Sequence, residues 1–109
     1  MSRAVVLLRG VNLADVVTRN PLASVASDPR RHQVTFLAGA PHPEAVRELE
    51  SAALGDERLV HVGRELHSWH PRGIGRSKLA RLLSGKRLGV TATTRNWATV
   101  TALLSLATE

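Results

Sequence analysis

Leu59-Val60-His61-Val62-Gly63-Arg64-Glu65-Leu66-His67-Ser68-Trp69-His70 is the stretch that decides the fold. Its two ends, residues 59–62 and 66–70, are predicted strands, and Gly63 to Glu65 supply the turn between them. Strands joined by so short a turn run antiparallel. A three-residue turn places His61 opposite His67, with His70 on the other face of the sheet. The sequence therefore predicts a β-hairpin here, from which the other elements can be placed.

Upstream of the hairpin, apolar runs alternate with residues that break regular structure. Ala4 to Leu8 and residues 33–38 are predicted strands, because both are short and contain β-branched residues. Residues 12–31 are rich in Asn, Asp, Pro and small side chains, which predicts a linker with at most one helical turn. A helix is expected from Pro43 to a stop at Gly55, since its apolar residues recur at helical spacing.

Downstream, a glycine-containing loop precedes a short helix that is expected to end near Gly85. An extended piece then leads to Thr94, the predicted N-cap of a last helix with Trp97 in its apolar stripe. The resulting order, β-α-β-β-α-(β)-α, predicts an α+β sandwich. Its sheet should be mostly antiparallel, with helices covering one face.

The composition is that of a globular protein. The chain has 109 residues, 43% of them apolar, and no cysteine, which rules out disulfides, thiolate metal sites and a cysteine nucleophile. No apolar run approaches the ~18 residues of a membrane span. We therefore expect a cytoplasmic protein that has no membrane partner.

The charge is unevenly distributed. Residues 64–109 hold eight Lys and Arg against two Glu, so the net charge of +6 comes from this part of the chain. Such a surface attracts anions, which makes a phosphate, a nucleotide or a nucleic-acid backbone the natural partner. Phe36, Trp69 and Trp97 are the only aromatic residues, too few for a platform that stacks successive bases.

One loop combines this charge with glycine. Gly73 and Gly75 free the backbone, and the helix expected to begin at Arg76 or Ser77 turns unpaired N–H groups outward. Arg95 and Asn96, placed in the first turn of the last helix, either share this anion or, for Arg95, pair with Glu65. The alternative is a capped hairpin exit with solvated charges. The predicted anion-binding residues are Gly73, Gly75, Arg76, Ser77, Lys78, Arg95 and Asn96.

The same stretch argues against several kinds of chemistry. It lacks the Gly-Lys-Ser/Thr order of a phosphate-binding Walker loop and the third glycine of a dinucleotide fingerprint. No carboxylate lies between Glu65 and Glu109, and Ser77 and Lys78 are adjacent, so they point apart on a helix. Two histidines facing each other do not make a zinc site. The sequence predicts no catalytic residue, cofactor or metal.

Several motifs together resemble one family. They are Leu7-Leu8-Arg9-Gly10-Val11-Asn12, Val34-Thr35-Phe36-Leu37-Ala38, Gly63-Arg64-Glu65-Leu66, Gly73-Ile74-Gly75-Arg76-Ser77-Lys78-Leu79 and Thr93-Thr94-Arg95-Asn96-Trp97. This set resembles the bacterial domain-of-unknown-function family 1697, closely and colinearly from about His32 onward. The resemblance implies a ferredoxin-like α+β fold, in a family with two such domains and no established activity.

The chain also departs from that family's pattern. Most of a first domain is expected after Asn12, but the linker follows almost directly, and Ala98 replaces a residue that is usually polar. The resemblance thus implies a truncated member, with residues 1–31 as a remnant and linker and residues 32–109 as the second domain. The strand Val5 to Leu8 would then add to the remaining sheet or mediate a homo-oligomer.

Three functions remain open from the sequence. The first, which we favour, is a binding module for a phosphate-bearing ligand or a nucleic-acid backbone. The second is an enzyme acting on a small phosphorylated or carboxylate substrate. The third is a truncated fragment that is non-functional or self-associates.

Overall fold

The computed structural model describes residues 13–83 and 88–107 of the chain. The predicted strand at residues 4–8, its proposed role in oligomerisation and the helix end near Gly85 lie outside the described residues. The described elements are α2 (Leu13–Thr18), β1 (His32–Leu37), α3 (Pro43–Ala52), β2 (Arg58–Val62), β3 (Glu65–Trp69), α4 (Lys78–Leu83), β4 (Ala92–Asn96) and α5 (Trp97–Ala107).

The four described strands form one antiparallel sheet in the order β2-β3-β1-β4. β1 pairs with both β3 and β4, so it lies inside the sheet, where Val34 and Thr35 are fully buried. The prediction of an α+β fold with a mostly antiparallel sheet is confirmed. The element order from β1 to β4 is compatible with a ferredoxin-like β-α-β-β-α-β arrangement.

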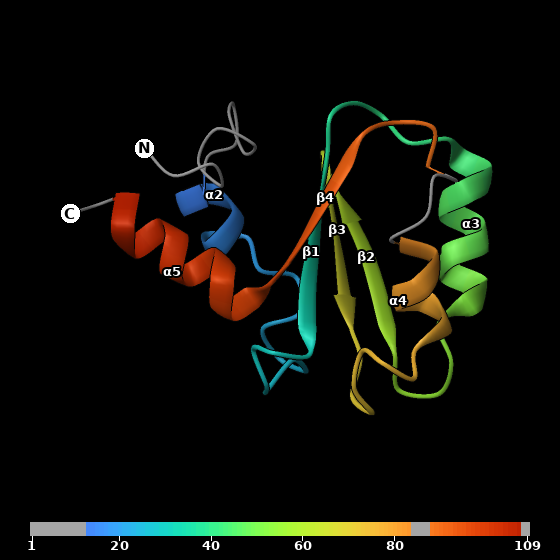
Figure 1. Cartoon of the computed structure of the whole chain (residues 1–109), viewed down its shortest axis with the longest axis horizontal. Helices are drawn as coiled ribbons and strands as arrows, with labels where there is room; N and C mark the ends of the chain where they lie inside the picture. Colours follow the sequence, from blue (N-terminus) through green and yellow to red (C-terminus); the bar gives the residue numbers. More distant parts are fainter. Residues whose placement is uncertain (1–12, 84–87, 108–109) are drawn as a thin grey trace.

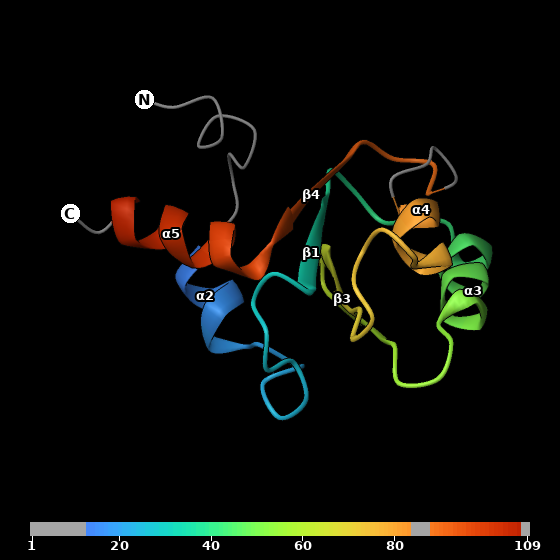
Figure 2. The same ribbon diagram turned by 60° about the horizontal axis from the view of Figure 1, so that its bottom comes forward.

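Helices lie on both sides of the sheet. α3 and α4 cover one face, whereas α2 and α5 lie against the other (Figures 1 and 2), so the helices are not confined to one face as the sequence predicted. Successive side chains of β1 point to opposite faces, and its residues from Val34 to Leu37 are all buried, so both faces need a cover. One core contains Leu37, Ala45, Leu49, Leu66, Leu79, Leu83 and Leu88; the other contains Val16, Val34, Phe36, Val100 and Leu103.

The hairpin formed by β2 and β3 has a tighter turn than expected. Val62 pairs with Glu65, which leaves only Gly63 and Arg64 in the turn. Gly63 has φ 57° while Arg64 has no positive φ, the combination that a type II′ turn requires. The prediction that His61 faces His67 is therefore wrong. His61 lies opposite Leu66, and the two imidazoles point to opposite faces of the sheet.

The start of the last helix also differs from the prediction. β4 continues to Asn96, and α5 begins only at Trp97. Asn96 Oδ1 accepts a hydrogen bond from the Thr99 N–H at 2.8 Å, so Asn96 rather than Thr94 caps the helix. Thr94 is held in the sheet, where its hydroxyl contacts that of Thr35 at 2.9 Å.

The rings of His32, His67 and Trp97 pack together at the start of α5. The His32 ring stacks on the half-buried Trp97 at a centroid distance of 4.5 Å, and His32 Nε2 lies 3.1 Å from His67 Nδ1. Both imidazoles are buried. Among the described residues, no helix is long and apolar enough to cross a membrane.

Candidate functional site

The loop that joins β3 to α4 presents three cations to solvent. It runs from His70 to Ser77, and Arg72 and Arg76 within it and Lys78 directly after it are exposed. None of the three forms an ion pair with a described carboxylate. By contrast, Arg19 pairs with Glu65 at 3.7 Å and Arg31 with Asp28 at 3.6 Å. The loop thus presents three cations that have no ion-pair partner among the described carboxylates.

Backbone hydrogen bonds fix the path of this loop. The Gly73 N–H donates to the His70 carbonyl at 2.9 Å, and the Ser77 N–H donates to the Ile74 carbonyl at 3.1 Å. Gly73 has φ 92°, which other residues rarely adopt. The Arg31 guanidinium donates to the Pro71 carbonyl and so ties the loop to the segment before β1.

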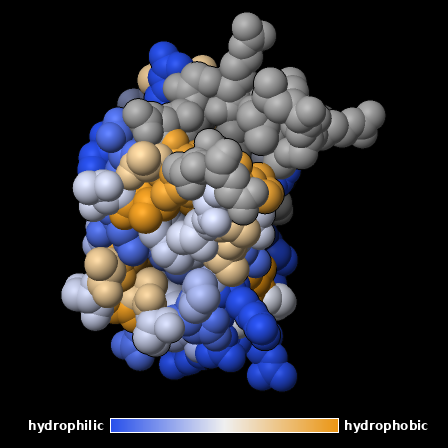
Figure 3. Space-filling model, turned by 90° about the vertical axis from the view of Figure 1, so that its left-hand side faces the viewer, coloured by the Kyte–Doolittle hydropathy of each residue, from blue (hydrophilic) through white to orange (hydrophobic). Residues whose placement is uncertain are grey.

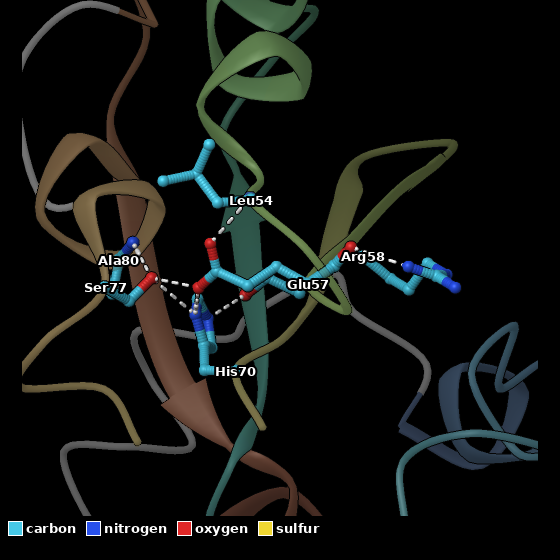
Figure 4. A network of polar contacts seen from close by, with 7 residues as sticks. Leu54, Glu57, Arg58, His70, Ser77 and Ala80 are labelled. Carbon is cyan, nitrogen blue, oxygen red and sulfur yellow. Dashed lines mark hydrogen bonds and ion pairs between the residues drawn. The ribbon is translucent and has the colours of Figure 1, made fainter. Parts of the chain in front are cut away.

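Beneath the loop, side chains that directly flank β2, β3 and α4 form a buried polar network (Figure 4). Ser77, the residue before α4, donates its hydroxyl proton to Glu57 Oε2 at 2.5 Å. Its Oγ also accepts the Ala80 N–H at 3.1 Å, so Ser77 is the N-cap of α4, as the capped-exit alternative expected. His70 Nδ1 lies 2.9 Å from Ser77 Oγ and 3.2 Å from Glu57 Oε2.

The partners determine where the protons lie. A carboxylate only accepts hydrogen bonds, so the ring proton of His70 belongs on Nδ1, facing Glu57 and Ser77. Nε2 is then an acceptor and takes the hydroxyl proton of Ser68, whose Oγ lies 2.8 Å away. The Leu54 N–H completes the set by donating to Glu57 Oε1 at 3.1 Å. Every polar group of the network is satisfied in this arrangement.

Of the two ionisable groups in the network, one is charged and the other neutral at neutral pH. Burial works against ionisation of Glu57, but hydrogen bonds from Ser77, the Leu54 N–H and His70 outweigh it and lower the pKa of the carboxyl. Burial lowers the pKa of His70, although the Glu57 carboxylate opposes that shift. At neutral pH the network therefore holds a carboxylate beside a neutral imidazole.

The connectivity of Ser68, His70 and Glu57 matches that of a Ser-His-acid triad, because the hydroxyl meets Nε2 and the carboxylate meets Nδ1. Access is missing, however, since Ser68 and His70 are both 0% exposed. Ser77 cannot use His70 as its base, because the nitrogen that it faces already carries the proton. The arrangement therefore holds the two ends of the loop together rather than performing nucleophilic chemistry.

The structure divides the predicted anion-binding residues into two groups. Gly73, Gly75, Arg76, Ser77 and Lys78 lie together in the loop and at the start of α4. Arg95 and Asn96 lie in β4.

Arg95 lies opposite Val34, whose side chain packs in the core beneath α5, so Arg95 points to the face of the sheet away from α4. Its guanidinium donates to the Thr94 carbonyl at 2.8 Å, and Glu65 pairs with Arg19 instead. The single pocket that Arg95 was expected to share with the loop is therefore not formed.

Sequence reasoning missed the anchoring role of Glu57 and His70. The signal was in the hairpin, because Arg58 pairs with Trp69, and the next residues outward are Glu57 and His70. A carboxylate and an imidazole at that position are natural hydrogen-bond partners. No cluster of three metal-ligating side chains occurs among residues 13–83 and 88–107.

A family model described as "Protein of unknown function (DUF1697)" matches residues 1–67, more than half of the chain. This confirms the family that the sequence resembles. The matched range ends before the loop with Gly73 and before β4. Comparisons with curated proteins and with solved structures gave no match.

Proposed function

The chain belongs to the DUF1697 family, and we propose that it acts as a binding module for the phosphate group of an anionic ligand. The observation that carries the proposal is the loop from His70 to Ser77. It presents Arg72 and Arg76 to solvent, together with Lys78 beyond it, without a described carboxylate partner.

The anchoring of the loop supports this role. Glu57, His70 and Ser77 hold both of its ends, so little conformational freedom is lost when a ligand binds. Arginine presents planar donors that match the oxygens of a phosphate, and lysine adds a point charge. In this proposal Ser77 serves to position the loop, because its hydroxyl proton is already given to Glu57.

The alternative of an enzyme has less support. The hydroxyl and imidazole that have a triad-like connectivity are fully buried, so a substrate does not reach them in this conformation. Self-association through Val5 to Leu8 concerns residues outside the described part of the chain.

Thermal unfolding in phosphate and in chloride at equal ionic strength tests the proposal. A ligand that binds only the folded chain raises the melting temperature, so phosphate should stabilise the wild type more than chloride does. Arg72→Ala combined with Arg76→Ala should remove most of this difference. Arg64→Ala, at the exposed hairpin turn on the opposite end of β3, is the matched control and should keep it.

The double variant also accounts for the general stabilising effect of excluded salts. That effect acts on any folded chain, so it persists in the double variant. An equal phosphate increment in the wild type and in the double variant would refute the loop as the binding site.

A further inference from the structure

A groove beside the loop runs between α3 and α4. Its volume is about 530 Å³, within the range of small-molecule sites. On α3 the lining side chains follow helical spacing along one stripe, and on α4 they are one turn apart. The lining consists of Glu44, Arg47, Glu48, Ser51 and Ala52 from α3, and Lys78 and Leu82 from α4.

The lining combines both signs of charge with an apolar floor. Arg47 and Lys78 come from the two helices, and neither forms an ion pair with a described carboxylate, although Glu44 and Glu48 line the same groove. Ala52 is buried and Leu82 is half-buried, so both can contact apolar atoms of a ligand. Lys78 belongs both to this groove and to the cationic edge of the loop, which makes the two features continuous.

From this arrangement we propose that the groove receives the organic part of a small phosphate monoester that carries hydroxyl groups. The inference rests on the proposed phosphate-binding function of the loop. The phosphate lies toward Lys78 and Arg76, the carbon skeleton lies over Leu82 and Ala52, and hydroxyl groups donate to Glu44.

The Glu44 carboxylate favours this ligand class over a nucleic-acid backbone. The groove lining contains two cations and two carboxylates, so its formal charge is balanced. A polyanion lying along it would meet a like charge at Glu44, which is unfavourable. A monoester brings its negative charge to one end only and offers a hydroxyl donor to the Glu44 carboxylate, so its charge pattern matches the groove.

Three probes test the inference by titration calorimetry with the full chain: inorganic phosphate, methyl phosphate and ribose 5-phosphate. Ribose 5-phosphate should bind about tenfold more tightly than methyl phosphate, the ratio expected from one net hydrogen bond to a charged group. Glu44→Ala should remove most of this ratio, because it removes the hydroxyl acceptor. Glu50→Ala, an exposed glutamate of the same helix outside the lining, should preserve it.

A second variant blocks the groove without touching the charges. Ser51→Trp fills the space between the helices and should reduce ribose 5-phosphate binding to the level of methyl phosphate. If methyl phosphate and ribose 5-phosphate bind equally well to the wild type, the groove inference fails while phosphate binding by the loop stands. The same holds if Ser51→Trp leaves the affinity for ribose 5-phosphate unchanged. If none of the three probes binds, the proposed function and this inference fall together.

Discussion

At the scale of single residues, Ser77 has a structural role that its sequence motif did not indicate. Its hydroxyl caps α4 and donates to Glu57, and it lies within hydrogen-bond distance of His70. The residue is 4% exposed, so water does not replace these bonds readily. Its role is to join the start of α4 to the ends of β2 and β3.

Ser77→Ala should lower the free energy of unfolding by about 1–3 kcal/mol, the cost of losing an N-cap and leaving buried partners unsatisfied. Urea unfolding followed by circular dichroism measures this loss. Ser24→Ala, at an exposed position before β1, is the same substitution and should change stability by less than about 0.5 kcal/mol. Equal midpoints for the two variants would contradict the anchoring role.

The buried pair His32 and His67 should make the stability of the fold depend on pH. Burial lowers the pKa of His32 to about 4, with a smaller contribution from the charge of His70. Burial also lowers the pKa of His67 to about 4, with smaller contributions from His32 and Arg19. Both rings have an ordinary pKa of 6.5 when unfolded, so between pH 6.5 and 4 the unfolded chain binds more protons than the folded chain.

Stability should therefore be full above pH 6.5 and decline as the pH falls toward 4. The slope should reach about 1.4 kcal/mol per pH unit for each proton taken up on unfolding. Urea midpoints at pH 7.5, 6.0 and 5.0 measure it. His61→Gln, which changes an exposed histidine, should leave the slope unchanged, and a flat profile in the wild type would show that the pair is not buried in solution.

At the scale of elements, the position of the last cap is open to a direct test. Asn96 Oδ1 accepts the Thr99 N–H, so Asn96→Ala should cost about 1 kcal/mol, whereas Asn96→Asp retains an acceptor and should cost less. Both are measured by urea unfolding. If Asn96→Ala and Asn96→Asp are equally stable, the hydrogen bond at the start of α5 contributes nothing.

The existence of most elements could be predicted, and some of their boundaries could not. Pro43 and the apolar spacing after it marked the start of α3 correctly, because the helix signals there agree with one another, but the helix ends at Ala52 rather than near Gly55. Both Thr94 and Asn96 are good caps in isolation, and only the pairing of Thr94 with Thr35 across the sheet decides between them. The turn at Gly63 was misjudged by one residue, which moved His61 to the other face.

The same reasoning explains what was found and missed in the site. The glycines and cations of the loop are consecutive, so the sequence displays them together. Glu57 and His70 are thirteen residues apart and meet only through the hairpin register. Arg95 was grouped with the loop because its strand was taken for a helix, and the extended backbone instead turns it to the opposite face.

At the scale of the whole molecule, the second helical layer is the least predictable feature. α2 has six residues within a segment rich in helix-breaking residues, too short to be stable alone. Its stability comes from packing against α5 and β1, where Val16 is 2% exposed. On this side of the molecule hydrophobic residues are visible at the surface (Figure 3), and Leu106 of α5 is 63% exposed.

This packing bears on the division of the chain that the resemblance implies, with residues 1–31 as a remnant and linker and residues 32–109 as the second domain. A remnant that does not contribute to the fold would tolerate a smaller side chain at position 16. Val16→Ala should instead lower the free energy of unfolding by about 1–3 kcal/mol, because it removes two methyl groups from a filled core and leaves a cavity. Val25→Ala makes the same change at a residue that is 42% exposed and should have little effect.

Urea unfolding should be followed by tryptophan fluorescence and by circular dichroism. Coincident transitions shifted only by Val16→Ala would place α2 in one cooperative unit with the sheet, and equal stability of the two variants would support a dispensable remnant.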